Sequence, residues 1–340
     1  MPVSPAIPQL DLSRFDAGSE PRAAFLHELR VAARDVGFFY LTGHGIEPDL
    51  LRGLLAVARR FFALPEPEKL AIEMVNSPHF RGYNRVAREL TRGSPDWREQ
   101  IDFGAERPAL PHRADLPAWT RLQGPNQWPA ALPEMRATVT RWQSAALEVL
   151  HRLLTAFSLA LGQAANALEG LYREEPHHLV KLIRYPGRHT TPSDQGVGAH
   201  KDSELLTLLL QDANSHSHSH GGLQVETPRG WIDVPPVPGT LVVNIGELLE
   251  LASDGYLRAT LHRVVTPPAG VERLSAAFFL GARLDATVPL LRLPAALAAQ
   301  AQGPESDPHN PLFRSVGQNY LKGRLRSHPD VAQRHHCDLL

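Results

Sequence analysis

The sequence predicts a mainly β protein with flanking helices, because two kinds of pattern divide the chain. From about residue 178 to residue 285, short apolar stretches recur at close spacing and are separated by Pro and Gly. This pattern is typical of an antiparallel sandwich or barrel, double-sheet jelly rolls included. Helical periodicity dominates the part before it. We therefore expect four regions: an N-terminal α/β region with an irregular segment (1–130), a long helical region (131–177), a β core (178–285) and a C-terminal tail with a helix (286–340).

The N-terminal region combines strand-like and helical patterns. Residues 7–12 loosely alternate apolar and polar side chains, and residues 37–41 form an apolar run, so we expect a strand at each. Apolar residues at helical spacing predict amphipathic helices over residues 20–34 and 48–63. Pro21 fits the first turn of the earlier helix, where a missing N–H costs little.

Residues 73–130 have no clear periodicity and are rich in Pro, Gly, Arg and Trp. A connection of this length within a compact domain is usually a functional loop. The segment supplies five candidate substrate contacts: Phe80, Arg81, Tyr83, Gln100 and Phe103. The arginine favours an anionic substrate, and Asn319 or Tyr320 of the tail are further candidates.

The longest helical pattern covers residues 132–168, with its apolar side chains on one face, as a core helix requires. A short helix (246–253) and a tail helix (312–328) are also expected. The strand-like stretches of the β core are residues 179–185, 198–202, 205–211, 222–226, 230–234, 240–245, 260–265 and 274–280. The insertion from His216 to His220 alternates His and Ser. We interpret it as a polar hairpin insertion, although alternating His can also bind a metal.

The composition excludes several classes of partner. The 340 residues carry a formal net charge of -1, so a nucleic acid is not expected to bind. No apolar run approaches a membrane span, and the N-terminus lacks the pattern of a signal peptide. Cys337 is the single cysteine, which fits a reducing compartment. We expect a cytoplasmic protein that does not bind membranes; the sequence does not indicate an oligomeric state.

A candidate metal site lies at the start of the β core. His200 and Asp202 are two positions apart before an apolar strand, so their side chains can share one face. His262, on a later predicted strand, is the candidate third ligand. Two His and one carboxylate, with the opposite positions open, suit non-haem Fe(II).

A candidate carboxylate anchor lies on the strand that follows. Arg273 and Ser275 are two apart and share a face. The arginine fork binds a carboxylate through two hydrogen bonds, and the neighbouring hydroxyl adds another. Because an unpaired charge inside a barrel is costly, a bound dicarboxylate would supply the missing partner.

These residues in this order resemble the HxD…H…RxS pattern of the Fe(II)/2-oxoglutarate dioxygenases, and more narrowly the isopenicillin N synthase-like family. The stretches 37–46, 182–186, 222–225 and 243–246 add to the resemblance, which extends from about residue 5 to residue 330. It implies a double-stranded β-helix, a distorted jelly roll, with N-terminal helices packed outside it. Residues 178–285 would then be a jelly-roll catalytic core, with the irregular segment on the substrate side.

The resemblance also implies an activity and roles for single residues. His200, Asp202 and His262 would be the catalytic iron ligands. Arg273 and Ser275 would hold the far carboxylate of the co-substrate 2-oxoglutarate, and Tyr185 would line that pocket. The implied enzyme is a dioxygenase that uses Fe(II), O2 and 2-oxoglutarate to oxidise, most simply to hydroxylate, a small molecule. Ile183 keeps an alternative open: many members carry Asn at this position, and isopenicillin N synthase itself oxidises its substrate without 2-oxoglutarate.

Overall fold

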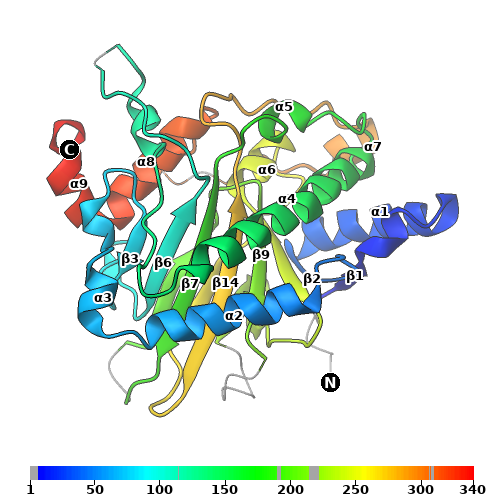
Figure 1. Cartoon of the computed structure of the whole chain (residues 1–340). Coiled ribbons are helices and arrows are strands. Elements are labelled where there is room, and N and C mark those ends of the chain that lie inside the picture. The colour runs from blue at the N-terminus through cyan, green and yellow to red at the C-terminus, as the bar shows by residue number, and fades with distance from the viewer. Residues whose placement is uncertain (1–6, 114, 190–192, 214–221, 306, 308–309) are drawn as a thin grey trace.

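The computed structural model describes residues 7–113, 115–189, 193–213, 222–305, 307 and 310–340 (Figure 1). One large sheet has the spatial order β1 (Gln9–Asp11), β2 (Phe38–Thr42), β12 (Leu241–Ile245), β9 (Leu206–Gln211), β14 (Glu272–Leu280), β7 (His178–Pro186), β6 (Glu99–Gly104) and β3 (Gly82–Asn84). A second sheet has the order β11 (Gly230–Asp233), β10 (Leu223–Thr227), β13 (His262–Val265) and β8 (Gln195–His200). A hairpin of β4 (Leu90–Thr91) and β5 (Ser94–Pro95) stands apart from both sheets.

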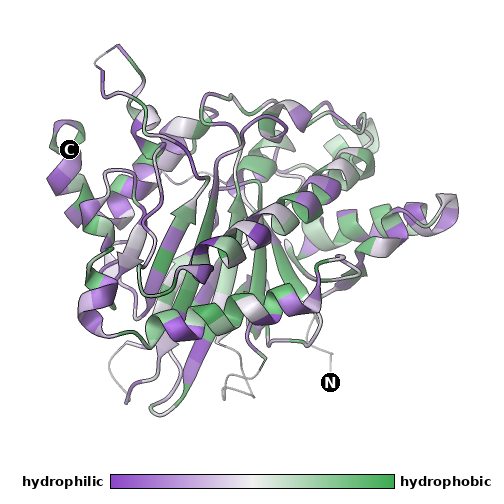
Figure 2. Cartoon of the chain, viewed as in Figure 1, coloured by the Kyte–Doolittle hydropathy of each residue, from purple (hydrophilic) through white to green (hydrophobic). Residues whose placement is uncertain are grey.

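Two long helices pack on the outer face of the large sheet. The described helices are α1 (Ser19–Asp35), α2 (Pro48–Phe62), α3 (Glu66–Leu70), α4 (Glu134–Ala160), α5 (Glu169–Tyr172), α6 (Glu247–Ala252), α7 (Ala295–Ala298), α8 (Val316–Ser327) and α9 (Pro329–His335). Figure 1 shows α2 and α4 crossing this face, and both helices mix hydrophobic and hydrophilic residues in Figure 2. Their buried apolar residues belong to the core that the strands of the large sheet also line. Within the described ranges, no helix is long and apolar enough to cross a membrane.

The chain passes back and forth between the two sheets from β7 onward. β7, β9, β12 and β14 lie in the large sheet, while β8, β10, β11 and β13 lie in the small one. This alternation along the chain is the double-stranded β-helix, so the predicted mainly β class with outer helices is confirmed. The inner faces of the two sheets meet in an apolar cluster to which both sheets contribute: Phe38, Tyr40, Ile183, Tyr185, Val197, Leu223, Val225, Val234, Val242 and Val264.

Strand alternation separates the helix-covered face of the large sheet from its inner face. In β7, Val180 and Leu182 belong to the core under the helices. Ile183 and Tyr185 belong to the inner cluster, and Lys181 shares their face. The register pairs Tyr185 with Arg273 of β14, so the inner face continues across strands. The inside of the barrel therefore carries charged as well as apolar side chains.

Three expected elements differ from the observed ones. The segment expected to be irregular supplies β3 and β6, which extend the large sheet beyond β7. The long helical pattern ends at Ala160, and Gly162 follows with a φ of +70°, a left-handed conformation that glycine adopts readily. The strand before the metal motif ends at His200, so Asp202 lies in the following turn. The insertion from His216 to His220 lies outside the described residues.

Candidate active site

The two histidines and the aspartate come together at the open end of the barrel. His200 ends β8 and His262 begins β13, and these two residues face each other in the strand register. One ligand atom from each of the three residues lies within 4.8 Å of the others. Asp202 Oδ1 is 3.5 Å from the Nε2 atom of each histidine. The three ligand atoms thus converge on one point, where they could bind one side of a metal ion.

Hydrogen bonds behind the triad orient these ligand atoms. The Nδ1 atom of His200 lies 2.8 Å from the Gly198 carbonyl, and that of His262 lies 3.0 Å from the Thr260 carbonyl. Since a carbonyl can only accept, both Nδ1 atoms carry the proton, which leaves both Nε2 atoms free to ligate a metal. Asp202 Oδ2 accepts from Thr207 and Asn244, so its Oδ1 is the free oxygen.

The electrostatics of the triad suit a bound cation. Burial alone would raise the pKa of Asp202, but His262 and His200 beside it hold that pKa well below its usual range. Burial likewise opposes the charged form of His262, yet the Asp202 charge raises the pKa of its imidazole overall. A proton on the imidazole here takes the place that a metal ion would fill, because both compensate the buried carboxylate.

A buried arginine lies on the inner face of β14, deeper in the barrel. Arg273 is 3% exposed, and Ser275 beside it is 1% exposed. The Arg273 guanidinium donates to Ser275 Oγ at 3.2 Å and to Gln211 Oε1 at 2.9 Å, and it lies 4.8 Å from the ring centroid of Tyr185. In the described part of the chain no carboxylate pairs with it. A buried cation with neutral partners only is suited to bind an anion such as the far carboxylate of 2-oxoglutarate.

A cavity of about 880 Å³ borders the triad, and Arg273 does not line it. Its wall includes the ligands His200 and Asp202. Charged side chains make up much of the remaining wall: Glu89, Arg98, Lys181, Lys201, Glu204, Glu247, Lys322 and Arg324. Arg273 and Ser275 are not part of this wall. The buried Arg273 and the cavity are therefore two separate features of the molecule.

The sequence and the fold match proteins of known class. The model of the 2OG-Fe(II) oxygenase superfamily matches residues 176–282, and that of the N-terminal region of a non-haem dioxygenase in morphine synthesis matches residues 7–131. The 2-oxoglutarate-dependent dioxygenase frbJ of Dothideomycetidae sp. is 36% identical, covering 97% of this chain and 91% of that protein. The chain belongs to the 2OG-Fe(II) oxygenase superfamily.

Two further similarities bear on this oxygenase. The homoarginine-6-hydroxylase 2-ODD-C23.1 of Arabidopsis thaliana is 35% identical, over 83% of this chain and 86% of that protein. The crystal structure of a full-length Neurospora crassa protein in complex with alpha-KG (2-oxoglutarate) and thymine has a TM-score of 0.72 at 25% identity, over 96% of each chain. The oxygenase therefore couples 2-oxoglutarate decarboxylation to oxidation of a small molecule with Fe(II) and O2. The alternative, an oxidase without 2-oxoglutarate, is not favoured; Ile183 simply packs in the inner apolar cluster.

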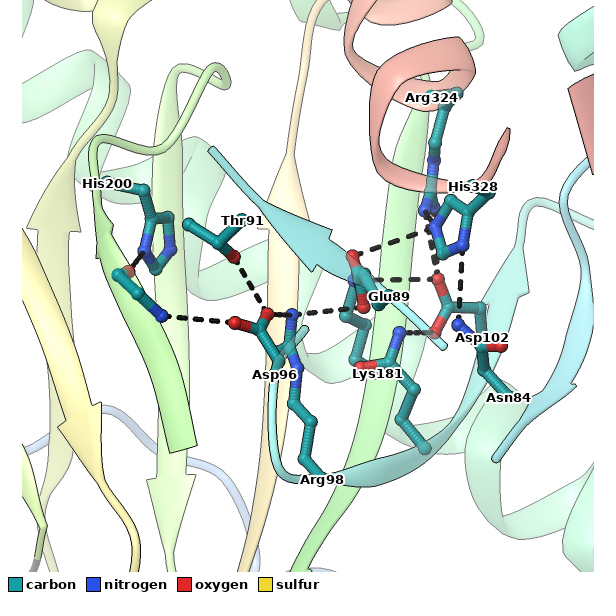
Figure 3. Close-up of polar contacts among 12 residues, drawn as sticks. Asn84, Glu89, Thr91, Asp96, Arg98, Asp102, Lys181, His200, Arg324 and His328 are labelled. Atoms are coloured by element: carbon teal, nitrogen blue, oxygen red, sulfur yellow. Dashed lines mark hydrogen bonds and ion pairs between the residues drawn. The ribbon is translucent and has the colours of Figure 1, made fainter. Parts of the chain in front are cut away.

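Buried ion pairs fill the cavity side opposite the triad (Figure 3). Lys181 Nζ lies 2.7 and 3.0 Å from the two carboxylate oxygens of Glu89, which also pairs with Arg98 at 3.0 Å. Both terminal nitrogens of the Arg324 guanidinium donate to Asp102 Oδ2 at 3.1 Å. Burial opposes ionisation of Glu89, but its two cationic partners hold its pKa well below the usual range. We call Glu89, Arg98, Asp102, Lys181 and Arg324 the charged cluster.

The five residues proposed from the sequence as substrate contacts do not line this cavity. Tyr83 and Phe103 lie on the helix-covered face of their strands. Phe80 stacks on His336, and Arg81 donates to backbone carbonyls. Gln100 faces inward, but its amide bonds to Asp102. Their role as substrate contacts therefore stays a prediction. Asn319 and Tyr320 of α8 do lie on the cavity wall.

Sequence reasoning missed two carboxyls of the cavity wall, Glu204 and Glu247. Burial is the main cause that raises the pKa of Glu204 to about 8, with Asp202 adding to it. Burial also raises the pKa of Glu247 to about 7. Glu204 follows Asp202 by two positions, a signal that the sequence contained. Glu247 gave no local signal, since it comes near the triad only through the fold.

Proposed function

We propose that this oxygenase hydroxylates a small amino acid with a cationic side chain, homoarginine being the first to test. The overall reaction would convert substrate C–H, 2-oxoglutarate and O2 into substrate C–OH, succinate and CO2. Three observations support the substrate class: the identity of 35% to a protein named homoarginine-6-hydroxylase, the charged cavity wall, and enough volume, about 880 Å³, for an amino acid.

Each site residue has a proposed part in this reaction. His200, Asp202 and His262 would hold Fe(II), whose chemistry is the activation of O2 and the oxidation itself. Arg273 and Ser275 would orient the far carboxylate of 2-oxoglutarate. Tyr185 would keep the guanidinium in place through its ring. The observation that carries this assignment is the buried Arg273 charge, which has no carboxylate partner in the described ranges.

The test is substrate-dependent formation of succinate. Purified protein with Fe(II), O2 and 2-oxoglutarate should release succinate faster when homoarginine is present, in step with a product that mass spectrometry finds heavier by one oxygen atom. His200→Ala should remove both signals. Stimulation by neutral or acidic molecules, with none by cationic amino acids, would refute the proposed substrate class.

Other proposed properties concern partners and place. The formal net charge of -1 supports a free small molecule, rather than a nucleic acid, as the substrate. The absence of membrane binding and the cytoplasmic location that the sequence predicts stay predictions.

A further inference from the structure

Two carboxyls and one hydroxyl of the cavity wall have few or no partners among the described residues. Glu204 is 7% exposed, and in the described part of the chain its carboxyl makes no ion pair and only one long hydrogen bond, 3.4 Å from Ser203 Oγ. The Glu247 side chain makes neither kind of contact with any described residue. The Tyr320 hydroxyl is buried and has no hydrogen-bond partner there. Glu204 and Tyr320 are buried, whereas Glu247 is partly buried. Buried polar groups are usually satisfied, so an unmet one in a cavity indicates a missing ligand.

The backbone holds both carboxyls on the same wall. The Glu247 N–H donates to the Asp202 carbonyl at 2.7 Å, and the Leu248 N–H donates to the Glu204 carbonyl at 3.1 Å. A Cβ atom at Gly246 would lie only 2.0 Å from the Glu204 carbonyl oxygen, so this close approach depends on glycine. The start of α6 is thereby fixed against the turn that follows the metal motif.

Most cations around the cavity already bond to other groups. In the charged cluster, Lys181 and Arg98 bond to Glu89 and Arg324 bonds to Asp102. On the rim, Lys201 pairs with Glu250 and Glu305, and Lys322 bonds to the Pro311 carbonyl. Among the described residues, neither Glu204 nor Glu247 makes an ion pair, although Lys201 and Lys322 are near enough to Glu247 to favour its charged form. A ligand that brings a positive charge and N–H donors would satisfy them, whereas an anionic group would meet two carboxyls.

We propose that Glu204, Glu247 and Tyr320 form the subsite for the cationic end of the substrate. This inference rests on the proposed function and adds to it the residues that select the substrate. A guanidinium carries five N–H donors in a planar fork, enough to reach two carboxylates and a hydroxyl oxygen together. A neutral urea of the same shape has a carbonyl oxygen where the guanidinium has nitrogen. It would leave a carboxyl unsatisfied, which is the kind of mismatch that gives strong discrimination.

The experiment compares two ligands of the same shape and different charge. Homoarginine carries a guanidinium, and homocitrulline carries the neutral urea. Their binding would be measured by calorimetry, without O2, to the full-length protein with Fe(II) and 2-oxoglutarate bound. Wild-type protein should bind homoarginine at least about tenfold more tightly, and Glu204→Gln and Glu247→Gln should each weaken homoarginine binding about 10- to 100-fold. Homocitrulline binding should change little in either variant.

Two further variants separate this role from a general effect. Glu305→Gln removes a rim carboxyl that pairs with Lys201, and it should leave the binding of both ligands unchanged. Tyr320→Phe should lower homoarginine affinity by about fivefold, the value of one neutral hydrogen bond. If Glu204→Gln fails to fold, Glu247→Gln decides the result alone.

Three outcomes would overturn the subsite. They are equal losses for both ligands in the Gln variants, unchanged homoarginine binding in those variants, and wild-type protein that binds no cationic amino acid. The last outcome is separable from a failure of the catalytic assignment. Succinate formation stimulated by some other small molecule would show that the 2-oxoglutarate chemistry stands while the cation subsite does not.

Discussion

Replacing Arg273 with Ala should raise the KM for 2-oxoglutarate far more than it lowers kcat. The Arg273 side chain is 3% exposed, so any carboxylate it binds is shielded from water. Losing one partner of a buried, hydrogen-bonded charge pair costs about 3 kcal/mol, and that loss corresponds to a KM increase of about 100-fold. Ser275→Ala removes one neutral hydrogen bond of about 1 kcal/mol, which gives about a fivefold increase.

The assay is the initial rate of succinate formation against 2-oxoglutarate concentration, with Fe(II) and substrate held saturating. Arg184→Ala is the matched control. Arg184 is next to Tyr185 on β7, but it lies on the opposite face and pairs with Glu99 and Glu272. Its KM for 2-oxoglutarate should match that of the wild type. A rate that is lower in Arg273→Ala by the same factor at every 2-oxoglutarate concentration, with an unchanged KM, would refute the role of Arg273 as the anchor for 2-oxoglutarate.

Three other perturbations test the site and its surroundings. Asp202→Ala should abolish the binding of Co(II), as measured by absorption spectroscopy. In the wild type, the affinity for Co(II) should fall about tenfold per pH unit below the raised pKa of His262, since a metal displaces its proton. An affinity for Co(II) that stays constant down to about pH 5 would contradict this. Burial lowers the pKa of His328 to about 3. The unfolded chain, with a pKa near 6.5 at this histidine, then binds more protons, so wild-type stability should fall by about 2 kcal/mol more than that of His328→Gln between pH 7 and 5 in urea titrations; parallel losses would argue against it. Gly246→Ala should lower the free energy of unfolding by about 1–3 kcal/mol in thermal melts, because the new methyl group clashes with the Glu204 carbonyl oxygen. An unchanged melting temperature would show that the backbone shifts to accommodate the methyl group.

The clustering of His200, Asp202 and His262, and of Arg273 with Ser275, was predictable because the signal is local. Arg273 and Ser275 are two apart on β14, where strand geometry gives them a shared face, and Asp202 reaches the same point as His200 from the turn after β8. His262 needed only its place on a later strand. Each of these inferences depends only on residues of one strand and the turn after it, and such local patterns can be read directly from the sequence.

The charged cluster was not predictable because its members meet only after the sheet forms. β6 was missed even though polar Gln100 and Asp102 alternate with apolar Ile101 and Phe103, a pattern with the period of a strand. The polar positions face the barrel interior and the apolar ones face the helices, so side-chain polarity does not tell inside from outside. Arg324 reaches Asp102 from a helix more than two hundred residues away, and no local pattern carries that contact.

β7 fixes the distance between the two halves of the site. Tyr185, beside the proposed 2-oxoglutarate anchor, and Lys181, in the charged cluster, are four residues apart on one face of a continuous strand, about 13 Å at strand spacing. A one-residue insertion between them would turn one of the two side chains to the outer face. In relatives of this protein, the stretch between positions 181 and 185 can therefore change by substitution but not by insertion or deletion. Relatives with other substrates would be expected to keep the Tyr185 end, to vary at position 181, and to vary in length only in the segments beyond the strand.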